Sequence, residues 1–144
     1  MAILTPQAVR EMVLDKVEKN YLIDGQELSD TQIRLAMDMV VSEWNATPPT
    51  DAVTIQNFPY YHILVSGVLY RCFIGLAALA ARNQFSFVDG GVSVPLEERF
   101  QLYQALAGMY QSDYQTSMQR VKISINMDSG WGGLGSDYAR FPIW

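Results

Sequence analysis

Chemically reactive side chains are scarce in this sequence, whose 144 residues include one cysteine and one histidine. The single cysteine, Cys72, cannot form an internal disulfide, which excludes a disulfide-stapled scaffold and suits a reducing compartment. Because Cys72 lies in an apolar run, we expect a buried, inert thiol. Together with His62 it falls short of the ligands that a zinc site of the His/Cys kind needs within one chain.

Charge is also scarce, since Asp, Glu, Lys and Arg make up 17% of the residues and the formal net charge is −5. A protein that binds nucleic acid through the phosphates needs a basic patch, and a net negative charge argues against such a patch. Charged side chains normally cover the surface of a small domain. Their shortage indicates that part of the surface faces protein, although a charge-poor soluble monomer stays open as the alternative.

The longest apolar stretch, residues 60–81, is the best candidate for a membrane span. Arg71 lies near its middle, where a charge costs a few kcal/mol or more in a bilayer. The apolar run after Arg71 is too short to cross a membrane. We therefore expect a buried helix and no membrane association, and the opening MAILTPQAVREMV shows no secretory signal.

No pattern typical of catalysis is present. The sequence lacks a G-x-S-x-G nucleophile elbow, and the run DSGWGGLG lacks the Lys-Ser/Thr ending of a phosphate loop. Glu97 and Glu98 lie in the first turn of an expected helix, where the helix dipole already favours carboxylates. We expect no catalytic residue, no cofactor and no bound metal.

Hydrophobic periodicity predicts four helices. The first covers about residues 6–20, with Thr5 as N-cap, Pro6 at the first helical position and Asp15 on the wet face. The second starts at a capping box of Ser29 and Gln32 and ends before Pro48. The third covers 59–82 and is apolar nearly all round, as in a helix buried in its own bundle or by neighbouring subunits. The fourth opens at Pro95 and has a heptad-like apolar seam from Leu96 to Val121.

Strand signals are weaker and fall between and after the helices. A short extended piece is expected at 53–55, and FSFVDGGVSVP indicates a small β-hairpin or loop between the last two helices. Residues 121–127 alternate between apolar and polar, the pattern of a half-buried strand. The expected fold is thus mainly α: a four-helix bundle domain over 1–121 and an extended C-terminal strand or arm over 122–144.

The C-terminal sequence combines glycines with large aromatic residues. A strand that lacks a partner can add to the sheet edge of another chain, and aromatic residues can anchor the segment in pockets. Packing of this segment on its own bundle is the alternative. The candidate partner-binding residues are Ile123, Ile125, Met127, Trp131, Leu134, Tyr138, Arg140, Phe141 and Trp144.

Five stretches together resemble the head-to-tail connector, or adaptor, proteins of the neck of tailed bacteriophages. They are SDTQIRLAMDMVVSEWNATPP, the apolar third helix, FSFVDGG, LEERFQLYQALAGMY and WGGLGSDYARFPIW, which span most of the chain. The resemblance is one of layout, without a residue-level signature. A subunit of a phage tail or baseplate would show the same features, and a helical small-molecule enzyme or regulator is a more distant alternative.

The resemblance implies a structural virion protein, assembled in the host cytoplasm and located in the neck at the head-tail interface. Such adaptors form a homo-oligomeric ring, usually of twelve copies, beneath the portal protein, and dock on the portal by a C-terminal arm. Here that arm would be 122–144, while the loops at 48–59 and 85–94 would contact neighbouring copies or the tail. A tail terminator or other neck or tail protein would bind the opposite face, and DNA would pass through the channel without specific binding.

Overall fold

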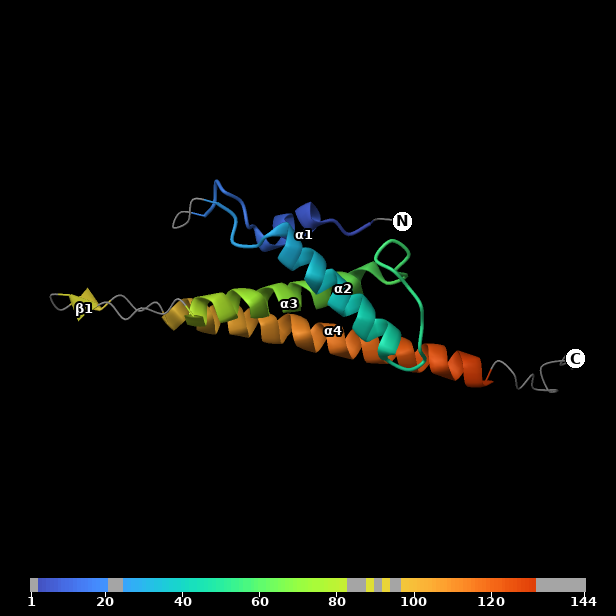
Figure 1. Cartoon of the computed structure of the whole chain (residues 1–144). Helices are drawn as coiled ribbons and strands as arrows, with labels where there is room; N and C mark the ends of the chain where they lie inside the picture. Colours follow the sequence, from blue (N-terminus) through green and yellow to red (C-terminus); the bar gives the residue numbers. More distant parts are fainter. Residues whose placement is uncertain (1–2, 21–24, 83–87, 90–91, 94–96, 132–144) are drawn as a thin grey trace, which may run out of the picture.

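The computed structural model describes residues 3–20, 25–82, 88–89, 92–93 and 97–131, and it is mainly helical. Within this part, α2 (Asp30–Ala46), α3 (Tyr61–Arg82) and α4 (Glu97–Trp131) lie against one another, with α3 between the other two (Figure 1). The short α1 (Pro6–Val13) packs against both α2 and α3. The prediction of a helical bundle with four helices is confirmed for these residues.

Helix α1 begins as predicted but ends seven residues early. Thr5 caps it by accepting a hydrogen bond from the Ala8 backbone N–H at 3.2 Å. Leu14 then adopts a left-handed backbone conformation with φ of 59°, which ends the helix. Asp15 turns inward and accepts the backbone N–H groups of Glu27 and Leu28 at 2.9 Å each. The prediction of a helix to residue 20 with Asp15 in water is therefore wrong. The Asp15 carboxylate instead accepts hydrogen bonds from the backbone of the segment that precedes α2.

Helix α2 follows its sequence signals closely. The Ser29 side chain accepts from the Gln32 backbone N–H, and the Gln32 side chain accepts from the Ser29 backbone N–H, so the capping box is confirmed. One face of the helix is buried, and its residues are Ile33, Ala36, Met37, Val40 and Trp44. The helix ends at Ala46, just before the two prolines.

The extended piece predicted at 53–55 does not form a strand. Asn45 at the end of α2 bonds both backbone groups of Val53: its amide nitrogen donates to the carbonyl at 2.9 Å, and its oxygen accepts the N–H at 3.0 Å. A side chain thus supplies the partners that a neighbouring strand would have offered. Between α3 and α4, β1 (Val88–Asp89) pairs antiparallel with β2 (Val92–Ser93).

Helix α3 approaches α4 most closely at Gly67. A methyl group built on Gly67 would lie 2.9 Å from the Tyr114 ring and 2.9 Å from a methyl of Val40. Glycine is therefore required here by the space between three helices. Tyr114 and Trp44 are both fully buried, and Trp44 packs edge-on against Phe58 with ring centroids 5.1 Å apart.

The seam predicted on the fourth helix is the face of α4 that packs on α3. We call it the inner stripe; in the described part it consists of Tyr103, Ala107, Tyr110, Tyr114, Met118, Val121 and Ile125. Tyr110 and Tyr103 both stack on Phe73 of α3. The predicted interruption at Ser117 has no effect on the packing, because Met118 beside it is buried.

Helix α4 continues to Trp131, so the prediction of a strand over 121–127 is wrong. The alternating apolar residues also fit a helix of 3.6 residues per turn. Val121 and Ile125 face the core, whereas Ile123 and Met127 face outward with 59% and 54% of their surfaces exposed. Residues 132–144, which complete the predicted arm, lie outside the described residues.

Candidate docking surfaces

The groups with catalytic potential are inert or separated. Burial raises the pKa of the Cys72 thiol to about 11, so it stays protonated at neutral pH. His62 is exposed in the first turn of α3, on the order of 15 Å along the helix from Cys72. Among the residues that the structure describes, no three His, Cys, Asp or Glu side chains gather as metal ligands would.

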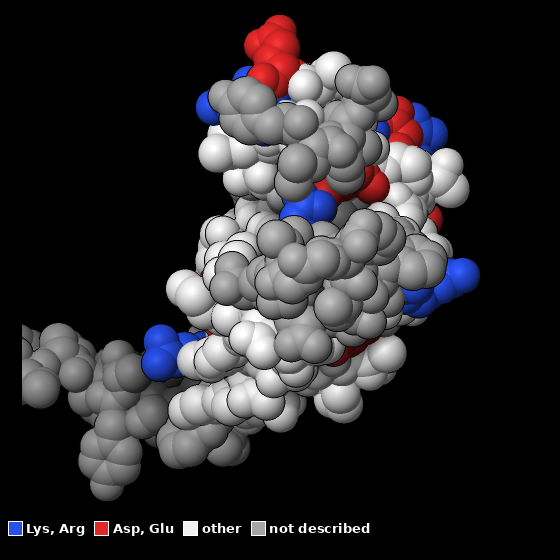
Figure 2. Space-filling view, turned by 90° about the vertical axis from the view of Figure 1, so that its left-hand side faces the viewer, with Lys and Arg blue, Asp and Glu red and all other residues white. Residues whose placement is uncertain are grey.

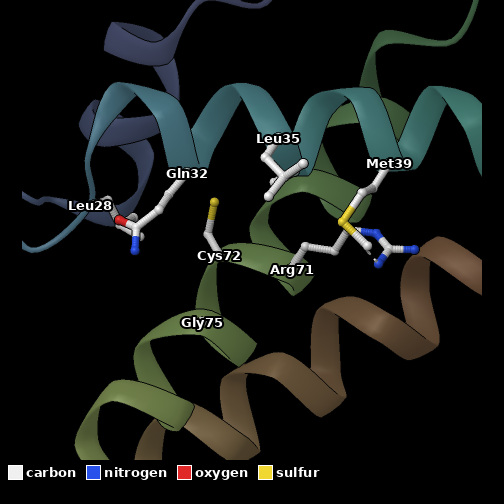
Figure 3. Close-up of a pocket in the computed structure, with 8 residues that line it drawn as sticks. Leu28, Gln32, Leu35, Met39, Arg71, Cys72 and Gly75 are labelled. Carbon is white, nitrogen blue, oxygen red and sulfur yellow. Dashed lines mark hydrogen bonds between the residues drawn. The ribbon is translucent and has the colours of Figure 1, made fainter.

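A shallow groove of about 150 Å³ runs between α2 and α3 (Figure 3). Its lining residues are Leu28, Gln32, Leu35, Ala36, Met39, Arg71, Cys72 and Gly75. Figure 3 shows the Cys72 thiol between the two helices and the Met39 sulfur beside the Arg71 side chain. Pockets for small molecules usually measure about 300–1,000 Å³. The groove is smaller than that, which makes a protein side chain a better match for it than a metabolite.

Arg71 is held in place by α2. Its Nη2 donates to Glu43 Oε2 at 2.7 Å, and its Nη1 lies 3.9 Å from the Met39 sulfur. This ion pair explains how α3 accommodates a charged residue in its apolar sequence. The Arg71 charge lies at the edge of the contact between α2 and α3, where Glu43 neutralises it. By length and composition α3 could cross a membrane, but the core helix of a soluble protein passes the same test, and 56% of the apolar window is buried here.

A second apolar surface runs along a flank of α4 that the other helices leave exposed. Its members share one helical face and are between 36% and 69% exposed. They form what we call the outer stripe: Leu102, Leu106, Met109, Ile123 and Met127. Asp113, Thr116 and Arg120 lie on the same face between the two apolar groups and are also exposed. The i, i+4, i+7 spacing of Leu102, Leu106 and Met109 is a sequence signal for this face, which the prediction of a single apolar seam missed.

Charged side chains are unevenly distributed over the molecule. Seen along the helices in Figure 2, red and blue atoms gather over the upper part of the molecule, while the described surface of the lower part is mostly white, with a few blue atoms at its sides. Between Arg99 and Arg120, α4 carries one charged residue, Asp113. Its Oδ2 accepts a hydrogen bond from the Ser66 hydroxyl at 2.5 Å. Much of the surface without charged side chains therefore lies along one long helix, α4.

Lys122 fixes the C-terminal part of α4 to the loop after α2. It is 3% exposed, donates from Nζ to the Pro49 carbonyl at 2.8 Å, and lies 4.3 Å from the Trp44 ring centroid. Loss of hydration lowers the pKa of Lys122, while the nearby Asp51 acts in the opposite direction. The alternating pattern had placed Lys122 on the wet side of a strand, so this contact was missed.

The predicted partner-binding residues fall into four groups. Ile125 is half-buried on the core and is not available to a partner, whereas Ile123 and Met127 belong to the exposed outer stripe. Trp131 is the last residue of α4. The remaining residues lie outside the described part of the chain, and they are Leu134, Tyr138, Arg140, Phe141 and Trp144.

Comparisons with protein-family models, with curated proteins and with solved structures returned no significant match. The function must therefore be argued from the surfaces of this chain itself.

Proposed function

We propose that this protein is a structural component of a phage virion, a head-to-tail connector that forms a ring between the portal and the tail. The observation that carries the proposal is the end of α4, which extends beyond the other helices (Figure 1). Residues 126–130 are all exposed, and Met127 among them is apolar. An exposed helix end that leads into an aromatic-rich sequence suits a protein whose C-terminus binds another chain.

The proposed docking segment is shorter than the arm expected from the sequence. Lys122 and Ile125 pack on the helical body, so the segment that docks on the portal begins after Ile125. The outer stripe and the uncharged length of α4 would face other copies or neighbouring neck proteins. The net charge of −5 suits a channel through which DNA passes without being held.

Removal of residues 132–144 tests the proposal directly. We expect the shortened protein to keep its thermal unfolding transition and to lose binding to the purified portal ring of the same virion. The point variant Trp144→Ala should weaken that binding about 30-fold, the loss of about 2 kcal/mol that an aromatic anchor causes. Isothermal titration calorimetry with the portal ring measures the binding of the shortened protein and of Trp144→Ala.

The conservative variant Tyr138→Phe, which keeps an aromatic ring, serves as the control and should bind within about 3-fold of the wild type. Full portal binding by the shortened protein would refute docking through this segment. Binding to a tail or baseplate protein instead of the portal would move the protein to that part of the virion. Loss of the thermal transition would show that the segment is part of the core.

A further inference from the structure

The outer stripe of α4 has a symmetry that points to a specific occupant. Met109 and Ile123 lie equally far from Thr116 along the helix, one on each side. Leu106 and Met127 lie about one turn further out in the same two directions. A surface that matches itself about a midpoint is what a two-fold interface between identical chains requires. We infer that the outer stripe packs antiparallel against the outer stripe of a second copy, with the two-fold axis near Thr116.

The charges on the stripe favour the same orientation. Asp113 precedes Thr116 and Arg120 follows it, so an antiparallel pair brings each Asp113 beside the other copy's Arg120. A parallel pair would place Asp113 beside Asp113 and Arg120 beside Arg120, and like charges repel. Within the described part of the chain no ion pair occupies Arg120, and Asp113 accepts a hydrogen bond from Ser66 through Oδ2, which leaves Oδ1 for the partner. The stripe therefore carries opposite charges at the two positions where an antiparallel partner needs them.

The opposite flank of α4 shows what a surface in water looks like on this helix. Between residues 101 and 119 it is polar and uncharged, and its residues are Gln101, Gln104, Gln111, Ser112, Gln115 and Gln119. The large exposed apolar residues of α4 thus gather on the outer stripe, where a partner helix would bury them. A closed ring uses head-to-tail contacts, whereas this pair is two-fold. We assign the pair to the free protein, and the inference stands independently of the proposed function.

Engineered cysteines in the full-length chain test the orientation. Leu106→Cys and Ile123→Cys variants, mixed and oxidised, should give mainly the disulfide between the two different variants, at least 10-fold more than either forms with itself. A helix pair in the parallel orientation gives the reverse ratio and would overturn the inference. The wild type supplies the background, since its only cysteine, Cys72, is 3% exposed.

Solution mass tests the pair itself. Sedimentation velocity of the wild-type chain at about 100 µM should give twice the 16.2 kDa of one chain. Met109→Lys should raise the dissociation constant at least 10-fold, while the matched control Gln115→Lys on the polar flank should leave it within 2-fold. Both positions are exposed, so neither variant disturbs the core.

A charge reversal at Arg120 tests the electrostatic part of the interface, which a simple loss of apolar contact area would leave unchanged. Arg120→Glu should weaken the pair more than the neutral Arg120→Gln does, and 0.5 M salt should remove the difference between the two variants. A wild-type chain that remains monomeric at 100 µM, or that binds phosphatidylcholine vesicles as a monomer, would overturn the inference. Equal effects of Met109→Lys and Gln115→Lys would overturn it as well.

Discussion

The two apolar stripes of α4 lie on one helix and differ in composition. The inner stripe is rich in tyrosine, with Tyr103, Tyr110 and Tyr114 packed on α3, whereas the outer stripe is made of leucine, isoleucine and methionine. Rigid aromatic rings fill a fixed space between three helices, as the contact of Tyr114 with Gly67 shows. Flexible aliphatic chains adapt to whichever surface covers them. The difference separates a face that holds the fold together from a face that is available to another chain.

The largest expected effect is the loss of the buried ring. Tyr114→Ala should lower the free energy of unfolding by about 3–5 kcal/mol, because it leaves a cavity beside Gly67 and Val40. The same truncation on the outer stripe, Met109→Ala, should change the stability of the monomer by no more than about 0.5 kcal/mol. Urea unfolding at about 1 µM protein measures both.

Tyr114→Phe is the control for this comparison. It keeps the ring and removes a buried hydroxyl that has no hydrogen-bond partner in the described part of the chain. Its effect should stay within about 1 kcal/mol. Equal losses from Tyr114→Ala and Met109→Ala would show that the two stripes contribute alike to the fold, and the comparison would fail.

Two glycines of α3 test the comparison between a covered and an exposed helix face on the helix that packs against α4. An added methyl at Gly67 meets Tyr114 and Val40 at 2.9 Å, while nothing lies within 4 Å of one at Gly75. Gly67→Ala should therefore cost about 1–3 kcal/mol through overpacking. Gly75→Ala should stabilise the protein by about 0.5–1 kcal/mol, since alanine favours the helix. Thermal unfolding followed by circular dichroism gives both signs, and a stabilising Gly67→Ala would contradict the packing.

Sequence reasoning located the elements whose signals are local. The capping box of Ser29 and Gln32 fixed the start of α2, and the apolar run fixed α3, because each signal depends on residues a turn apart. It misjudged the end of α1, where Asp15 satisfies backbone groups of residues 27 and 28. That contact closes over a loop, and no local pattern reveals it.

The error at residues 121–127 has a different cause. Val121, Ile123, Ile125 and Met127 alternate, and the same four residues supply two to each stripe of a helix. Extending an existing helix avoids the cost of nucleation, so the continuous helix wins unless a strand partner is present. The candidate docking residues beyond 131 stay predictions, and the outer stripe emerged only when the structure showed which face of α4 is covered.

The smallest expected effect concerns Lys122, at the point where α4 leaves the core. Because burial lowers the pKa of Lys122 in the folded protein, the unfolded chain binds more protons between that lowered pKa and the ordinary value of 10.5. Lys122 thus adds stability as pH rises through this window. Cys72 acts in the opposite sense above pH 9, because its pKa is raised to about 11. The contribution of Lys122 can therefore be isolated only as the difference in stability between the wild type and a variant that lacks this titration.

Lys122→Met keeps the length of the side chain and removes its titration. We expect the stability of the wild type relative to this variant to increase as the pH is raised from 8 to 10.5, measured by urea unfolding at closely spaced pH values. The exposed Lys19 offers the matched control, and Lys19→Met should show no such change. A flat difference for Lys122→Met would mean that the ammonium group is as well hydrated in the folded protein as in the unfolded chain. Lys122 would then hold the end of α4 through its hydrogen bond to the Pro49 carbonyl without a pH-dependent contribution to stability.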